Sequence, residues 1–118
     1  MTVLLVDDDA DVRFLMTRML KKAGVRQVKT YAGGEEAIES LGSGELPDLI
    51  ILDQNMPGLT GTQTLGRIRD QHPHMPILIS SGQPDIEAWD CFKQPRVAVI
   101  SKPFTLEEIS LKLARMSN

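Results

Sequence analysis

The sequence predicts an α/β fold of five strand–helix units, written (βα)5, with helices on both faces of a doubly wound five-stranded parallel sheet. Five short apolar runs alternate with segments whose apolar residues recur at helical spacing, an order typical of parallel sheets with right-handed crossovers. Three of the runs are nearly continuous Val, Ile and Leu, which indicates strands covered on both faces. The five expected strands are Val3–Val6, Gln27–Tyr31, Leu49–Leu52, Ile77–Ser80 and Val97–Ile100.

Helices are expected between these strands because apolar residues fall three and four positions apart. The first helix should end at Gly24, since glycine readily takes the left-handed conformation that closes a helix. The stripes of the first three helices are Val12, Leu15, Met16, Met19, Leu20 and Ala23; then Ala37, Ile38 and Leu41; then Leu65 and Ile68.

Two further helices complete the expected pattern. A fourth is placed in Asp85–Lys93, between the fourth and fifth strands. The fifth begins at Thr105, where Thr105 and Glu108 fit a capping box that satisfies two free backbone amides. Its apolar stripe is Leu106, Ile109, Leu113 and Met116.

The length and composition of the chain limit the classes of protein that fit it. The 118 residues suit one domain, 1–118, which can bury a core without disulfides. The net charge is −3 and no Lys/Arg cluster is present, so no direct contact with nucleic acid is expected. No apolar run has the length of a membrane span, and the first residues carry no export signal. The single Cys91 fits a reducing compartment, so a cytoplasmic location is expected.

Polar residues follow four of the five expected strands. Because the carboxyl ends of parallel strands meet at one edge of a sheet, these residues should lie together on a single rim. Clustered carboxylates resist being ionised together, and a hard dication such as Mg²⁺, or a lysine, relieves their repulsion. The sets are Asp7-Asp8-Asp9 after the first strand, Asp53 after the third, Ser80-Ser81-Gly82 at the fourth and Ser101-Lys102-Pro103 at the fifth.

These groups match the needs of phosphoryl transfer to a carboxylate. An aspartate can act as the nucleophile and form an acyl phosphate, while the other groups position the phosphoryl group and neutralise its charge. Each residue also has a structural interpretation. Asp9 and Asp11 are expected to serve as cap or turn residues rather than as ligands, and Ser80 is assigned a structural role in preference to Ser81.

The motifs together resemble the receiver domains of response regulators in two-component signalling. The residues that carry the resemblance are Val-Asp-Asp at 6–8, Leu-Asp-Gln-Asn-Met-Pro-Gly at 52–58 with Gly61, Ser-Ser-Gly at 80–82 and Ser-Lys-Pro-Phe at 101–104. The match covers essentially the whole chain. It implies the flavodoxin-like strand order 2-1-3-4-5, which spacing alone does not give.

The resemblance also implies roles for the rim residues. Asp53 would be the phosphoacceptor, and Asp7 and Asp8 would hold Mg²⁺, one directly and one through water. Asn55 would offer its backbone carbonyl to the same ion and direct its side chain outward.

Three more residues complete the site that the resemblance implies. Ser81 would bond the phosphoryl group through its hydroxyl, with room left by Gly82. Lys102 would pair with the phosphate, and the bond before Pro103 is often cis in such domains. The chain would therefore catalyse only its own phosphorylation and dephosphorylation, and it would not be an enzyme acting on other substrates.

Partners follow from the same resemblance. The phosphodonor would be a sensor histidine kinase or a phosphotransfer protein, and the output an effector domain or partner protein. Such domains commonly form homodimers through their fourth helix, fifth strand and fifth helix. One position departs from the family pattern: three residues before the lysine, where Tyr or Phe is usual, this chain has Val99. A valine cannot relay the hydroxyl's movement to that face by a ring rotation.

Three other functions compete with this interpretation. A calcium loop starting at Asp7 is excluded, because Val12 stands where glycine is needed and Arg18 where a bidentate glutamate is needed. A haloacid-dehalogenase-like phosphatase would need Thr or Val at Asp11, and the chain is short for a substrate-capping domain. The nearer alternative is a receiver-like interaction module that is never phosphorylated.

Overall fold

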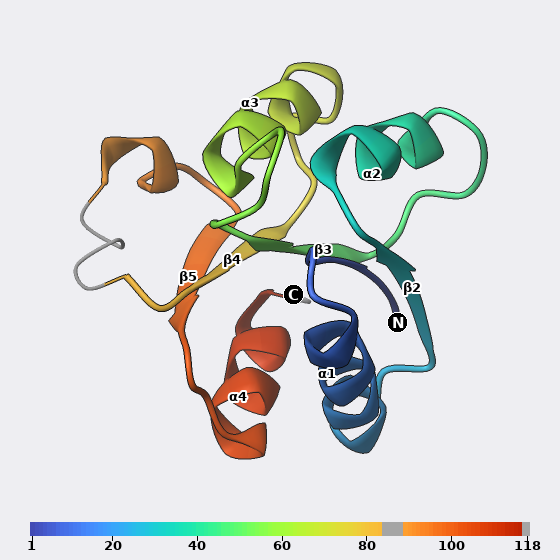
Figure 1. Ribbon diagram of the computed structural model, residues 1–118, viewed down its shortest axis with the longest axis vertical. Coiled ribbons are helices and arrows are strands. Elements are labelled where there is room, and N and C mark those ends of the chain that lie inside the picture. Colours follow the sequence, from blue (N-terminus) through green and yellow to red (C-terminus); the bar gives the residue numbers. More distant parts are fainter. Residues whose placement is uncertain (84–88, 117–118) are drawn as a thin grey trace.

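A five-stranded parallel sheet runs through the centre of the computed structural model, which describes residues 1–83 and 89–116 (Figure 1). The strand order is β2-β1-β3-β4-β5, as the resemblance implied. Each apolar run forms a strand, and no strand boundary differs from the expected one by more than one residue. The strands are β1 (Thr2–Val6), β2 (Gln27–Tyr31), β3 (Leu49–Asp53), β4 (Ile77–Ser81) and β5 (Val97–Ser101).

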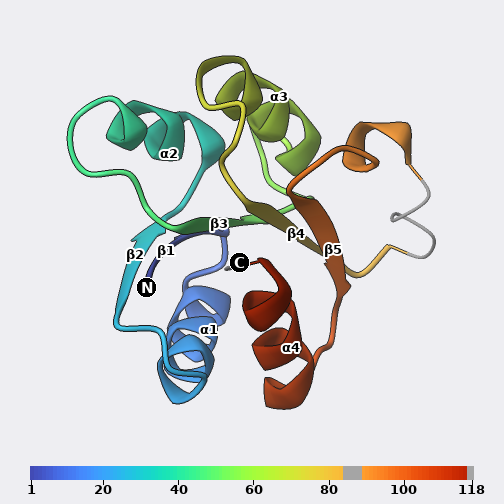
Figure 2. The ribbon, with the colours of Figure 1, turned by 180° about the vertical axis from the view of Figure 1, so that it is seen from behind.

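Two layers of helices cover the sheet, which confirms the expected α/β architecture. Helices α1 (Ala10–Lys22) and α4 (Leu106–Met116) lie on one face, and α2 (Gly34–Leu41) and α3 (Gly61–Gln71) lie on the other (Figures 1 and 2). Successive side chains of a strand point to opposite faces. In β1, accordingly, Val3 and Leu5 pack with α1 and α4, whereas Leu4 and Val6 pack with α2 and α3. None of the helices in the described ranges is long and apolar enough to cross a membrane.

Local signals fix the ends of several helices. Asp9 is the N-cap of α1, and its carboxylate accepts hydrogen bonds from the amides of Asp11 and Val12, as expected for a capping role. Gly24 follows α1 with φ of 99°, the left-handed conformation predicted for it. The capping box at α4 is confirmed: the Thr105 amide donates to Glu108 at 3.0 Å, and the Glu108 amide donates to Thr105 at 3.1 Å.

The expected fourth helix, Asp85–Lys93, falls partly outside the described residues, because 85–88 are not among them. In its described part, 89–93, the α-helix is replaced by the short 3₁₀ helix η2 (Asp90–Phe92), so there the prediction was wrong. The described ranges therefore hold four α-helices. Phe92 is buried and its ring stacks on that of Trp89 at 5.9 Å, so tertiary packing fixes this segment. Pro95 follows closely and disfavours a helical conformation at Gln94, which helps to end η2 early.

Candidate functional site

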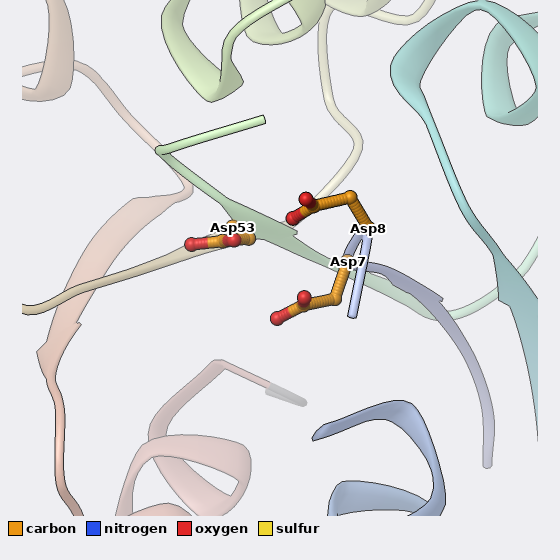
Figure 3. Close-up of side chains that lie close together, drawn as sticks. All are labelled: Asp7, Asp8 and Asp53. Carbon is orange, nitrogen blue, oxygen red and sulfur yellow. The ribbon is translucent and has the colours of Figure 1, made fainter. Parts of the chain in front are cut away.

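The acidic residues after β1 and at the end of β3 lie side by side because these strands are neighbours in the sheet. Val6 pairs with Leu52, so Asp7 and Asp53 leave the sheet at the same level. The side chains of Asp7, Asp8 and Asp53 enter one space beside the strand ends (Figure 3), where one carboxylate oxygen from each lies within 4.8 Å of the others. The structure thus brings together the three carboxylates that the sequence grouped.

Asp7 is buried, and both its carboxylate and its backbone carbonyl accept hydrogen bonds. The residue is 1% exposed. Its Oδ1 accepts a hydrogen bond from the Asp9 amide at 2.9 Å, and Arg13 donates to its backbone carbonyl at 2.6 Å. These contacts fix the turn that leads from β1 into α1. Asp8 is exposed, so the group opens to solvent on its side.

Lys102 lies between the two buried carboxylates. Its backbone amide donates to the Ser81 carbonyl at 2.8 Å, which ties the end of β5 to the end of β4. Its Nζ donates to Asp53 Oδ1 at 3.2 Å and to Asp7 Oδ2 at 3.3 Å. The bond from Lys102 to Pro103 is cis, as the resemblance implied. One ammonium group therefore serves two carboxylates separated from it by 49 and 95 positions in the chain.

The electrostatics of this cluster show in two pKa values. Burial raises the pKa of the Asp53 carboxyl above its ordinary value, and the neighbouring Asp7 raises it further; Lys102 and the Asn55 amide act in the opposite direction without cancelling the rise. Burial alone would lower the pKa of Lys102, but Asp53 and Asp7 outweigh it and the pKa is raised. Without a metal ion, the rim carries an excess of negative charge that a single lysine does not neutralise.

The other predicted site residues lie around the three carboxylates, and only some of them contact Asp53. The Asn55 side chain is exposed, as expected, and its backbone amide donates to Asp53 Oδ1 at 3.4 Å. Ser81 is the buried last residue of β4, and its hydroxyl oxygen accepts from the Gln83 amide at 3.0 Å. Within the described residues, no hydrogen bond joins Ser81 to Asp53. A Cβ added at Gly82 would meet no atom of the described residues within 4 Å, so space is left there.

The donor set suits a hard divalent cation. All three candidate side-chain ligands are carboxylate oxygens, the type that Mg²⁺ and Ca²⁺ prefer. Mg²⁺ holds oxygens at about 2.1 Å in an octahedron, so neighbouring ligands lie about 3.0 Å apart and opposite ligands about 4.2 Å. The three oxygens lie within 4.8 Å of one another, so direct binding by all of them would draw them closer together, whereas a water at the exposed Asp8 would span part of the distance. Asp7, Asp8 and Asp53 therefore fit Mg²⁺ in chemistry.

Sequence reasoning missed two polar contacts beside the site. Arg13 binds the Asp7 carbonyl, and Thr62 donates to the side chain of the buried Gln54 at 3.0 Å. Arg13 follows the cap residue Asp9 by one helical turn, and this spacing could have placed its side chain near the turn. Nothing in the sequence distinguishes the Gln54–Thr62 pair from surface polar residues.

Comparison with known proteins agrees with the geometry. A family model of the response regulator receiver domain matches residues 3–114. The DNA-binding transcriptional regulator NtrC of Escherichia coli K12 is 34% identical over 107 residues, which cover 90% of this chain and 22% of NtrC, so the chain spans about a fifth of that relative.

Two solved structures share the fold over nearly the whole chain. Chemotaxis protein CheY4 of Vibrio cholerae has a TM-score of 0.86 at 31% identity, covering 98% of this chain and 97% of that one. Response regulator TrrA of Thermotoga maritima, crystallised in complex with Mg²⁺-BeF, has a TM-score of 0.87 at 28% identity, covering 98% and 97%. The chain belongs to the response regulator receiver domain family.

Proposed function

We propose that this domain accepts a phosphoryl group on Asp53 from the phosphohistidine of a sensor histidine kinase or phosphotransfer protein, with Mg²⁺ bound at the rim. Asp7, Asp8, Asp53 and the backbone carbonyl of Asn55 would hold the ion. The observation that carries the proposal is the sharing of the Lys102 ammonium by Asp53 and Asp7, at 3.2 and 3.3 Å, beside a third carboxylate.

The chemistry assigned to the chain's own residues is a single displacement at phosphorus. A carboxylate oxygen of Asp53 forms the new bond to phosphorus as the bond to the donor imidazole nitrogen breaks, which leaves an acyl phosphate and a neutral imidazole after proton uptake. Lys102 moves its contact from the carboxylate to a phosphoryl oxygen. The Ser81 hydroxyl, which accepts from Gln83, still has its own hydrogen to donate. When bound, Mg²⁺ supplies charge neutralisation for the phosphoryl oxygens.

An apolar surface next to the rim supports a protein as the phosphodonor. Leu15 on α1 is 62% exposed, and Leu106 at the start of α4, which lines a common hollow with it, is 40% exposed. Leu15 also lines a groove of about 440 Å³, whose lining includes Lys102 of the rim itself. Exposed apolar patches of this kind mark protein contacts. The remaining lining residues are Val12, Met16, Met19, Pro103 and Phe104.

Output is proposed to pass through partner binding at the face formed by β5 and α4. Val99 is half-buried on this edge strand and packs against the core under α2 and α3, so it offers no ring to rotate. Leu111 on α4 is 52% exposed, close to Glu108 and Lys112 in a shallow pocket shared with Val99. A face with apolar and oppositely charged groups can complement a second copy of itself. The partner bound at this face is proposed to be a second copy of the domain or an effector domain, and the location is proposed to be the cytoplasm.

Intact-mass measurement tests the phosphoacceptor directly. The protein is incubated with Mg²⁺ and a small acyl phosphate, and the mass of one phosphoryl group is expected on the wild type. Asp53→Asn should lose it, whereas Asp70→Asn, a matched change of an exposed aspartate on α3, should keep it. Equal labelling of Asp53→Asn would remove Asp53 from the role. No labelling of any variant would favour the unphosphorylated interaction module, and steady release of inorganic phosphate from unrelated esters would favour a phosphatase.

A further inference from the structure

We propose that Gln54 and Thr62 are positioning residues whose side-chain hydrogen bond fixes the loop 55–60 and thereby sets the affinity of the rim for Mg²⁺. The inference rests on the proposed function, because it concerns the same ion and the same Asn55 carbonyl. It adds two residues that touch neither the ion nor the phosphoryl group.

Gln54 is a polar side chain in an apolar place. It directly follows Asp53 and is 6% exposed, and the β3 residues Leu49–Leu52 before it are all buried apolar side chains. A buried amide lowers stability unless it is hydrogen-bonded, whereas an apolar side chain of the same size would not. A buried amide here therefore points to a contact that an apolar residue could not make.

That contact joins the two ends of the loop 55–60. Gln54 Oε1 accepts a hydrogen bond from the Thr62 hydroxyl at 3.0 Å, and the Gln54 carbonyl accepts one from the Gly61 amide at 3.1 Å. On its other side, the Gln54 amide donates to the Ser80 carbonyl of β4 at 3.0 Å. Gln54 thus links the sheet to the first turn of α3, with the loop 55–60 closed between them.

The surroundings of Gly61 show how closely the two ends of this loop approach each other. A Cβ at Gly61 would lie 2.8 Å from Gln54 Cα, 2.8 Å from Gln54 Oε1 and 2.9 Å from the Asp53 carbonyl. Two of these three contacts are with backbone, which cannot move without shifting the strand end. Helix α3 can therefore begin this close to Asp53 only without a side chain at 61, and that approach brings Thr62 within reach of Gln54.

The loop held in this way carries the proposed carbonyl ligand. Asn55 is the residue next to Gln54, and its amide makes only a long contact of 3.4 Å with Asp53 Oδ1. Met56 is buried and anchors the next position. Mg²⁺ demands near-ideal octahedral geometry, so a carbonyl that wanders by a fraction of an ångström binds it less well. Loss of the Gln54–Thr62 bond should weaken Mg²⁺ binding by about three- to tenfold, the size of one hydrogen bond.

The test measures Mg²⁺ affinity by calorimetry on folded protein, without a phosphodonor. The variants are Thr62→Val, Gln54→Met, the double variant and Thr62→Ser, which keeps the hydroxyl. Ser40→Ala is the matched control, because it removes another half-buried hydroxyl bond, to the Ala37 carbonyl at 2.6 Å in α2. Amide hydrogen exchange of Asn55 in Mg²⁺-free protein is the second readout, and it does not depend on the ion.

We expect Thr62→Val and Gln54→Met to lower affinity by similar factors, the double variant to add little, and Thr62→Ser to restore wild-type binding. Asn55 exchange should rise in the first three variants and not in Ser40→Ala. Wild-type Mg²⁺ affinity in Thr62→Val and Gln54→Met, even with reduced stability, would overturn the inference and leave the proposed function standing. Absence of Mg²⁺ binding by the wild type would overturn the proposed function and this inference with it.

Discussion

Replacing Asp53 by Asn should stabilise the Mg²⁺-free protein at neutral pH, although it removes a hydrogen-bonded ion pair. The reason is the raised pKa of Asp53. A carboxyl whose pKa is higher in the folded state binds its proton more tightly there, so its contribution to stability is present below the unfolded value and lost as pH rises through the folded one. Above that range the buried carboxylate is ionised and destabilises the folded state, whereas the neutral Asn side chain does not.

Burial decides the sign of the effect, and the distances limit its size. At an effective dielectric constant of about 20, Asp7 within 4.8 Å repels the Asp53 carboxylate by about 3.5 kcal/mol, whereas Lys102 at 3.2 Å attracts it by about 5 kcal/mol. These two pairs alone would favour the ionised form, so the raised pKa shows that the cost of burying the charge, its largest cause, outweighs them. The net gain from neutralising Asp53 is therefore a small difference, on the order of 1 kcal/mol or about 4 °C in melting temperature.

The assay is chemical denaturation of both proteins in chelator, at about pH 7.5 and again near the ordinary aspartate pKa of about 4. Asp53→Asn should be the more stable protein at the higher pH, and the difference should shrink towards the lower. In saturating Mg²⁺ the order should reverse, because the wild type gains binding free energy that the variant largely lacks. A variant that is less stable than the wild type in chelator at neutral pH would show that the Lys102 pair outweighs burial and repulsion together, and the electrostatic reasoning would be refuted.

Three other changes test the remaining parts of the account. Lys102→Met leaves Asp7 and Asp53 without their shared cation, so Mg²⁺-free stability should fall by about 1–3 kcal/mol in denaturation, and part of the loss should return with Mg²⁺. Thr105→Ala removes half of the capping box of α4 and should lower stability by about 1 kcal/mol without changing Mg²⁺ affinity in calorimetry. Gly34→Ala places a methyl group against the Thr64 hydroxyl and Leu59, so it should lower the melting temperature, and an unchanged value would mean that α2 and α3 separate easily.

Most of the fold follows from local patterns. The strand runs end within one residue of the observed strands because buried parallel strands are continuous in Val, Ile and Leu. Asp9, Gly24 and Thr105 lie where the sequence placed them, since caps depend on neighbouring backbone amides rather than on distant packing. The described residues 89–93 of the expected fourth helix differ from the prediction, because the ring contact between Trp89 and Phe92 and the proline at 95 favour a short 3₁₀ helix there.

The sequence predicts which residues form the candidate site better than it predicts the contacts between them. Any parallel sheet collects strand-end residues on one rim, but the approach of Lys102 to Asp7 requires the order 2-1-3-4-5, which came only from the family resemblance. The bond between Gln54 and Thr62 depends on how closely α3 approaches β3, a distance that no local pattern encodes. The position of the Ser81 hydroxyl depends on a rotamer and on the Gln83 amide, which sequence does not specify either.

The most direct measurement is a crystal structure of the protein grown with Mg²⁺ and beryllium fluoride, a phosphoryl mimic. The account predicts beryllium bonded to a carboxylate oxygen of Asp53, Mg²⁺ within ligand distance of Asp7 and Asp53, and Lys102 and Ser81 in contact with the fluorides. A crystal grown with both reagents in which Asp53 is unmodified, and in which Lys102 still bridges Asp53 and Asp7, would contradict the claim that this rim binds a phosphoryl group.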